Sequence, residues 1–227
     1  MHPLDGTYER MARAGEHLAD LRDRADAICE EKRQGVVIHR EPTRFQLEDG
    51  REIDGVFARA DWTSEPIPVV ISILIGEVIY NLRAGLDYLV YALANPGTVV
   101  VNEKTQFPIE NTENAFVSRR NTFLKGVTDK HVASIERLQA FDGCDWTRTL
   151  RDLSNSDKHR HHTIVANPVH VTTAPGSTEA IIAGEVVDVE DDIAVSIFFR
   201  DRTPVIETLE QLLSEVTQVL DAFKPEF

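Results

Sequence analysis

The chain has 227 residues, which is long enough for one large domain or two small ones with a substantial apolar core. Lysine and arginine number 24 against 38 aspartate and glutamate residues, so the formal net charge is −14 at pH 7. A surface with this charge repels nucleic acid and anionic lipid as a whole, and any contact with RNA has to be local.

Two further features bear on the cellular compartment. Cys29 and Cys144 lack the spacing of metal ligands, and no charged-then-apolar leader follows Met1. Disulfides are rare where the cytoplasm keeps thiols reduced, so these features favour a cytoplasmic protein with unpaired cysteines.

The first part of the chain predicts a helix followed by a β-hairpin. Apolar residues recur at helical spacing over 4–31, which is typical of an amphipathic helix. Two extended runs follow at 36–47 and 53–62. Between them stands Asp49-Gly50, a strong signal for a two-residue hairpin turn. We therefore expect an N-terminal β-hairpin.

Residues 69–94 are apolar on nearly every side and predict the central helix of the fold. The polar side chains within this helix are Glu77, Asn81, Arg83 and Asp87. Each charge inside a membrane span costs about 2.5 to 3.5 kcal/mol, so we expect a core helix rather than a span. A buried helix has to give every polar group a partner, which predicts a polar cluster inside the fold.

Helices dominate the region after the central helix. An apolar plug at 107–109 is expected to dock on the core, because it is flanked by polar residues and carries a rigid proline bend. A short helix is predicted at 111–125 with Thr112 as its N-cap, and Asp129 is expected to cap the next one. A further helix is predicted at 146–162.

The last third of the chain changes to β-rich sequence. Extended runs at 164–172, 179–189 and 193–199 are separated by turn residues, which predicts an antiparallel β-meander. A final amphipathic helix is predicted within 203–223. No repeat or low-complexity linker marks a boundary, so we predict a single α+β domain over residues 1–227.

Three motifs carry a resemblance to a known group of proteins. They are NLRAGLDYLVYALA at 81–94, QFPI at 106–109 and LRDLSNSDKHR at 150–160. Together they resemble a family of uncharacterised bacterial and phage proteins with the same helix, hairpin, helix order. The resemblance covers most of the chain and implies no specific activity.

More remotely, the chain resembles HEPN domains, helical bundles that often dimerise and that, in active members, cut RNA with an arginine followed four to six residues later by a histidine. Arg83 matches the arginine, but Tyr88 stands five positions along where the histidine is expected. The reference pKa of tyrosine is about 10, which makes it a poor acid or base near neutral pH. The resemblance therefore implies a HEPN-like bundle around the central helix and a homodimer, without the usual catalytic pair.

A second group of polar residues lies at 157–162, DKHRHH. If the preceding helix continues through it, Asp157 and His161 share the face of the inward leucines, and Lys158 and His162 share the neighbouring face. An aspartate and a histidine four residues apart can hold a zinc ion, but no third ligand is evident. We therefore predict no metal site.

This second group has two interpretations. In one, its side chains meet Arg83 and Asp87 to form a site for phosphate, nucleotide or metal; in the other, they form a salt-bridge network that locks two core helices. Both predict a charge-assisted bond from Arg83 to Asp157. Asp87 is then expected to bond to Lys158, His161 or a backbone donor.

Two functions remain open. The first is a non-catalytic HEPN-like binding or interaction module of unknown partner, without a cofactor. Its predicted binding residues are Asn81, Arg83, Asp87, Tyr88, Asp157, Lys158 and His161.

The alternative is an RNA-cleaving or nucleotide-handling enzyme that binds RNA or a nucleotide at a local site. Arg83 would stabilise the developing charge, and His159, His161 or His162 would act as acid or base.

Overall fold

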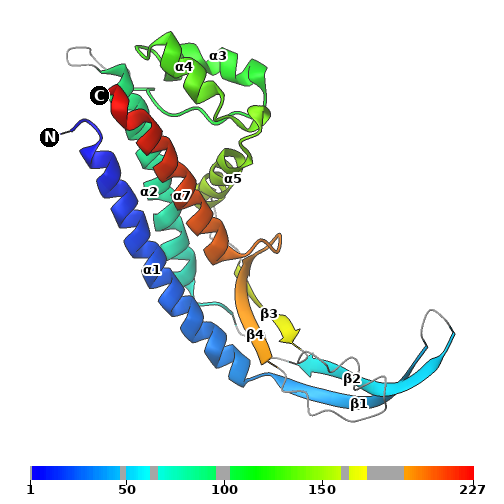
Figure 1. Ribbon diagram of the computed structural model, residues 1–227. Coiled ribbons are helices and arrows are strands. Elements are labelled where there is room, and N and C mark those ends of the chain that lie inside the picture. Colours follow the sequence, from blue (N-terminus) through cyan, green and yellow to red (C-terminus); the bar gives the residue numbers. More distant parts are fainter. Residues whose placement is uncertain (1, 47–49, 62–65, 96–102, 160–163, 173–191) are drawn as a thin grey trace. The chain divides into compact units, whose positions relative to one another are not determined.

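The computed structural model describes residues 2–46, 50–61, 66–95, 103–159, 164–172 and 192–227 (Figure 1). Its elements are α1 (Asp5–Gln34), β1 (Val37–Gln46), β2 (Glu52–Asp61), α2 (Val69–Ala94), α3 (Glu113–Phe123), α4 (Asp129–Glu136), η1 (Ala140–Asp142), α5 (Asp145–His159), β3 (Ile164–Thr172), β4 (Asp192–Phe199), α7 (Val205–Phe223) and η2 (Lys224–Glu226). Most of these elements are helices and the described strands pair antiparallel, so the predicted α+β class is confirmed.

The chain divides into two compact units that each combine segments distant in sequence. The first unit contains Met1–Arg22, Pro68–Thr163 and Val205–Phe227; the second contains Asp23–Ile67 and Ile164–Pro204. The single domain predicted over residues 1–227 stays a prediction. One border between the two units falls inside the continuous helix α1, so the sequence carries no linker composition there.

The second unit contains two antiparallel strand pairs. Strands β1 and β2 pair from Val37 opposite Asp61 to Gln46 opposite Glu52. Strands β3 and β4 pair in the same sense, with a register shift at Pro168, whose missing N–H cannot join the ladder. The run predicted at 179–189 lies outside the described residues.

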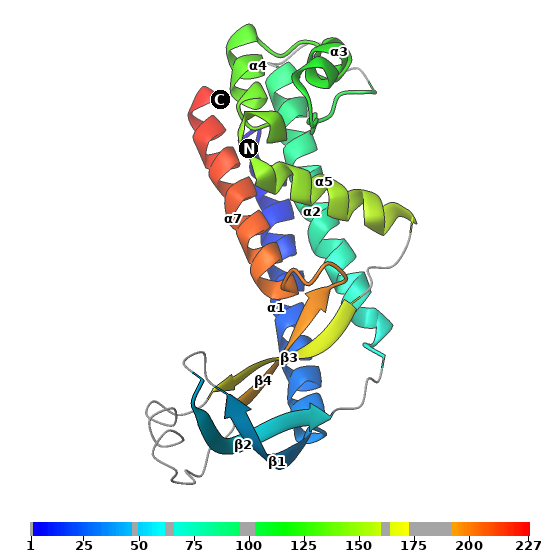
Figure 2. The same ribbon diagram turned by 90° about the vertical axis from the view of Figure 1, so that its right-hand side faces the viewer.

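Helix α2 is the core of the first unit and has the bounds predicted from the sequence. Of the described helices it has the most buried residues, as expected, and it contacts α5 and α7. Figure 2 shows α7 and the first part of α1 running along it. Length and composition alone would allow α2 to cross a membrane, but 61% of its apolar window is buried within the protein, which is typical of a core helix.

The helix caps confirm one prediction and correct another. Thr112 caps α3, where its hydroxyl accepts a hydrogen bond from the Ala115 N–H at 3.3 Å. The cap of α4 is Thr128 rather than Asp129, because the Thr128 hydroxyl accepts from the His131 N–H. Asp129 is instead the first helical residue, where its charge still favours the positive end of the helix dipole.

Two glycines with the same backbone conformation allow a matched test of this packing. Gly126 and Gly143 have φ angles of +93° and +94°, which side chains with a Cβ rarely adopt. A Cβ at Gly126 would lie 3.1 Å from the Ala94 carbonyl oxygen at the end of α2, whereas a Cβ at Gly143 would meet open space.

We predict that Gly143→Ala costs about 1 to 2 kcal/mol of unfolding free energy from backbone strain alone. Gly126→Ala should cost roughly 1 kcal/mol more, because the carbonyl of Ala94 must also move. Urea unfolding of both variants measures the difference. Equal losses would show that Gly126 does not set the approach of α4 to the end of α2.

Candidate functional site

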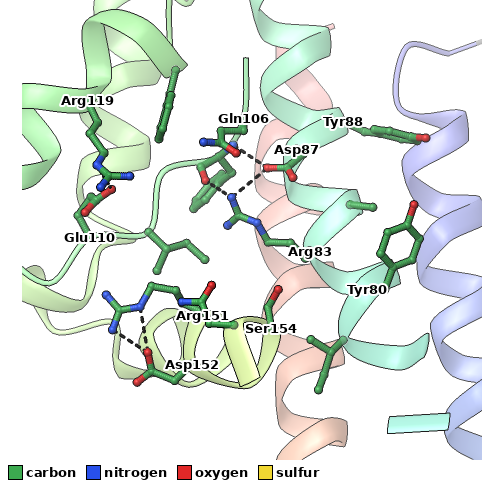
Figure 3. A pocket seen from close by; sticks show the side chains of 16 residues that line it. Tyr80, Arg83, Asp87, Tyr88, Gln106, Glu110, Arg119, Arg151, Asp152 and Ser154 are labelled. Carbon is green, nitrogen blue, oxygen red and sulfur yellow. Dashed lines mark hydrogen bonds and ion pairs between the residues drawn. The ribbon is translucent and has the colours of Figure 1, made fainter. Parts of the chain in front are cut away.

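A pocket of about 800 Å³ lies beside α2 in the first unit (Figure 3). Helix α2, the segment after it, α3 and α5 all contribute to its walls. Its polar lining residues are Tyr80, Arg83, Asp87, Tyr88, Gln106, Glu110, Arg119, Arg151, Asp152, Ser154 and Asn155.

Arg83 and Asp87 clamp the backbone of Phe107. The Arg83 Nη2 donates to the Phe107 carbonyl and lies 3.1 Å from the Asp87 Oδ1. The same Oδ1 accepts a hydrogen bond from the Phe107 N–H at 2.8 Å. One pair of side chains, one turn apart on α2, thus satisfies both backbone polar groups of one residue (Figure 3).

Gln139 continues the clamp along the same segment. Its side chain is fully buried; its Oε1 accepts from the Glu110 N–H, and its Nε2 donates to the Pro108 and Ile135 carbonyls at 2.9 and 3.0 Å. The plug predicted at 107–109 is docked on the core, since Phe107 is fully buried and Ile109 is 6% exposed. Side chains therefore supply the hydrogen bonds to the backbone of this segment that a neighbouring strand would otherwise supply.

The charged residues of the pocket are arranged as ion pairs. Besides the clamp, Arg119 lies 3.2 Å from Glu110, and Arg151 lies 2.7 Å from Asp152. Burial lowers the pKa of Arg83, an effect opposed by the charges of Asp87 and Glu110. An arginine stays protonated in proteins regardless, so the described lining residues carry three positive and three negative charges that balance.

A cation–π cluster stands beside this pocket. Arg10 of α1 lies 5.5 Å from the ring centre of Tyr80 and 5.4 Å from that of Tyr88. It also donates to the Tyr88 hydroxyl and to the Asn81 Oδ1, at 3.2 and 3.1 Å. The hydrogen bond that Arg10 donates to the Tyr88 hydroxyl is the main cause that raises the pKa of Arg10. Tyr80 and Tyr88 remain 57% and 43% exposed.

The polar residues predicted on α2 differ in burial and in their hydrogen-bond partners. Asn81 is buried and donates to the Glu77 carbonyl at 2.8 Å, while Glu77 itself is exposed. Arg83 and Asp87 line the pocket with Tyr88. The partner found for Asp87 is the Phe107 N–H, which is the backbone donor that the sequence allowed for.

The second predicted group is described only in part. Asp157, Lys158 and His159 belong to the last turn of α5, but their side chains lie outside the described part of the structure, as do His161 and His162 altogether. The bond from Arg83 to Asp157 therefore stays a prediction. The described portion of α5 contributes Arg151, Asp152, Ser154 and Asn155 to the pocket.

Sequence reasoning missed Arg10, Gln139 and the backbone of Phe107. Nothing in the sequence indicates which residue of α1 lies opposite Asn81, because the relative register of two helices is a tertiary property. Gln139 follows a short helix without any motif around it. The closeness of the QFPI and NLRAGLD motifs in sequence was the one available signal for the clamp.

The chemical groups present set limits on the described site. Among the residues described, no group of three or more His, Cys, Asp or Glu side chains is placed to hold a metal ion. Both described cysteines are free, and burial raises the pKa of Cys29 to about 11 and that of Cys144 above its usual value. Neither thiol is therefore an activated nucleophile.

Comparisons with protein-family models, curated proteins and solved structures gave no significant match to this chain. What the pocket can do is therefore argued from its own contacts, burial and charge.

We predict that Arg83→Ala lowers the free energy of unfolding by about 2 to 3 kcal/mol, because it removes the cation beside Asp87 and the donor to the Phe107 carbonyl. Asp87→Asn should cost only about 1 kcal/mol, since its amide oxygen can still accept from the Phe107 N–H. Arg13→Ala is the control: its ion pair with Glu16 is well exposed. It should change stability by less than about 0.5 kcal/mol.

Urea unfolding of the three variants makes this comparison. If Arg83→Ala is no more harmful than Arg13→Ala, the clamp does not hold the 107–110 segment.

Proposed function

We propose that this protein is a non-catalytic binding or interaction module. The observation that carries the proposal is that Arg83 and Asp87 are both engaged with the backbone of Phe107. A catalytic arginine has to direct its donors at charge that develops on a substrate. Here the Nη2 of Arg83 donates to the Phe107 carbonyl and forms an ion pair with Asp87. The two side chains therefore hold the Phe107 segment in the wall of the pocket.

A HEPN-like helical core is part of the proposal. Helix α2 supports this part of the proposal, because it is largely buried in the first unit and contacts α5 and α7. Arg10 of α1 also donates a hydrogen bond to Asn81 of α2. The β1–β2 pair is taken as the N-terminal hairpin, and β3 and β4 as members of a C-terminal meander. We also infer that the protein works in the cytoplasm.

The surface beside the pocket favours a protein partner over a polyanion. Tyrosine and arginine are the residue types that most often dominate binding energy in protein interfaces, and Arg10, Tyr80 and Tyr88 gather here with both rings exposed. The pocket charges balance, and the net charge of the chain is −14. A nucleic acid would find no excess of positive charge among the described residues of this pocket.

The partner that can be tested at once is a second copy of the chain. We predict a dimer in sedimentation equilibrium at micromolar concentration, with a dissociation constant that rises about tenfold in Tyr80→Ser because a packed aromatic ring is lost. Val117→Ser is the matched control, since Val117 is 40% exposed on α3 and away from the cluster. A monomer at all concentrations, or equal effects of both substitutions, would contradict dimerisation through this surface.

One observation favours the enzyme alternative. Helix α5 supplies Ser154 and Asn155 to the pocket that Arg83 lines, and His159 follows Asn155 by one helical turn. An imidazole with a pKa near 6.5 can act as acid or base in RNA cleavage, and an arginine can stabilise the developing charge. The histidines at 159–162 are therefore the groups to test for catalysis.

The two functions differ in a cleavage assay with labelled single-stranded RNA between about pH 5 and 8, the range in which histidine titrates. We predict no cleavage by the purified chain above that of a heat-inactivated sample. Cleavage that is lost in both Arg83→Ala and His159→Ala, but kept in Arg13→Ala, would overturn the non-catalytic proposal. His159→Ala is informative because it leaves the clamp at Phe107 intact.

A further inference from the structure

One face of α2 carries a continuous row of exposed, mostly apolar side chains, which we call the α2 stripe. Its members are spaced four, four and three residues apart, so the pattern repeats every 11 residues and stays on one side of the helix. They are Val69, Ile73, Glu77, Tyr80, Ala84, Tyr88 and Tyr91. All except Ala84 are exposed, with values of 43% to 60% for the valine, the isoleucine and the tyrosines. A row of this kind is typical of a surface that binds another protein.

Two charges of opposite sign accompany the α2 stripe. Glu77 lies within it, and no cation among the described residues bonds to its carboxylate. Arg10 of α1 lies beside it, next to the rings of Tyr80 and Tyr88, which point from α2 toward α1 (Figure 3). Its hydrogen bonds within the described part of the chain go to uncharged groups, the Asn81 Oδ1 and the Tyr88 hydroxyl. Both charges can therefore pair with a group on a partner.

A second copy of the chain could pack on the α2 stripe in two symmetric ways. With the two helices parallel, every position meets itself, so Glu77 would face Glu77 of the second copy. Like charges placed together across an interface are costly. With the helices antiparallel about a twofold axis at Tyr80, Glu77 comes opposite residue 83 of the second copy, because both lie three residues from the axis. The antiparallel arrangement therefore separates the two carboxylates.

The antiparallel arrangement also joins opposite charges. Arg10 is bonded to α2 at both ends of the range 81–88, so it lies beside the position that Glu77 of the second copy reaches. At a rise of about 1.5 Å per residue, the two groups are within roughly one turn of each other along the helix. At the ends of the stripe, Val69 of one copy comes opposite Tyr91 of the other. The α2 stripe is thus complementary to itself in charge and in apolar contacts.

We propose that two copies associate through antiparallel α2 stripes, with the twofold axis at Tyr80 and with Glu77 of each copy paired to Arg10 of the other; this arrangement rests on the dimer of the proposed function. Tyr80, Ala84 and Tyr88 also line the pocket beside Arg83. Helix α2 of the second copy therefore forms one edge of that pocket, and the binding site is complete only in the dimer.

Charge reversal in two separate variants tests the ion pair. Glu77→Arg and Arg10→Glu each bring like charges together twice in the dimer, so each variant alone should dimerise at least about tenfold more weakly than the unmodified chain. In an equimolar mixture, both contacts again join opposite charges. Sedimentation equilibrium of the mixture should therefore give a dissociation constant within roughly threefold of the original. Only a contact between two copies can produce this recovery.

Glu31→Arg is the matched control for charge. It makes the same change of charge at an exposed residue in the last turn of α1, away from Arg10 in the sequence. It should leave the dissociation constant unchanged. Circular dichroism of all three variants checks that each keeps its helical content.

Disulfide formation measures the orientation independently, in a chain that also carries Cys29→Ser and Cys144→Ser. In the antiparallel dimer, Val69→Cys should cross-link to Tyr91→Cys when the two variants are mixed under oxidising conditions, and neither variant should cross-link to itself. The parallel dimer would give the reverse of both results.

Two outcomes would overturn the antiparallel pairing while dimerisation itself stands: self-cross-linking of Val69→Cys, or a mixture of Glu77→Arg and Arg10→Glu that associates no better than either variant alone. A chain that stays monomeric at all concentrations would overturn the pairing together with the dimer of the proposed function.

Discussion

The first unit depends on how a short non-helical segment, 107–110, is buried although none of the described strands pairs with it. Four of its backbone groups are bonded to side chains: both polar groups of Phe107 to Arg83 and Asp87, and the Pro108 carbonyl and Glu110 N–H to Gln139. An unsatisfied buried group costs about 1 to 3 kcal/mol, so without these side chains the burial of Phe107 would lose much of its benefit.

This constraint explains why the most apolar helix of the chain carries charges. The Arg83–Asp87 pair stands on α2, between a buried core and a pocket, with side chains 19% and 31% exposed. A charge pair in that position is costly to desolvate and returns stability only when further hydrogen bonds complete it. The Phe107 backbone supplies those bonds, so the motif on α2 and the plug that follows it form one structural unit.

The sequence predicted the helices and strands more accurately than the side-chain contacts between them. Helix α2 was placed correctly because a predominantly apolar run is bounded by Pro68 and Asn95-Pro96, and proline does not continue a helix. The polar cluster was also expected, and the bond from Arg83 to Asp157 stays a prediction, but the Phe107 carbonyl was not foreseen as a partner of Arg83. Side-chain patterns do not reveal backbone acceptors, and the Phe107 carbonyl is therefore invisible to such reasoning. The Thr128 cap was missed for a simpler reason: two good capping residues stand side by side.

Tyr88 gives the two pockets a common wall. It lines both the pocket beside Arg83 and a second pocket, which Tyr91, His131 and Phe227 also line. Its hydroxyl accepts a hydrogen bond from Arg10, and its ring lies 5.4 Å from the same guanidinium. The position of this ring is therefore fixed by α1 as well as by α2. Tyr88 is therefore a side chain that joins two helices and lines two pockets.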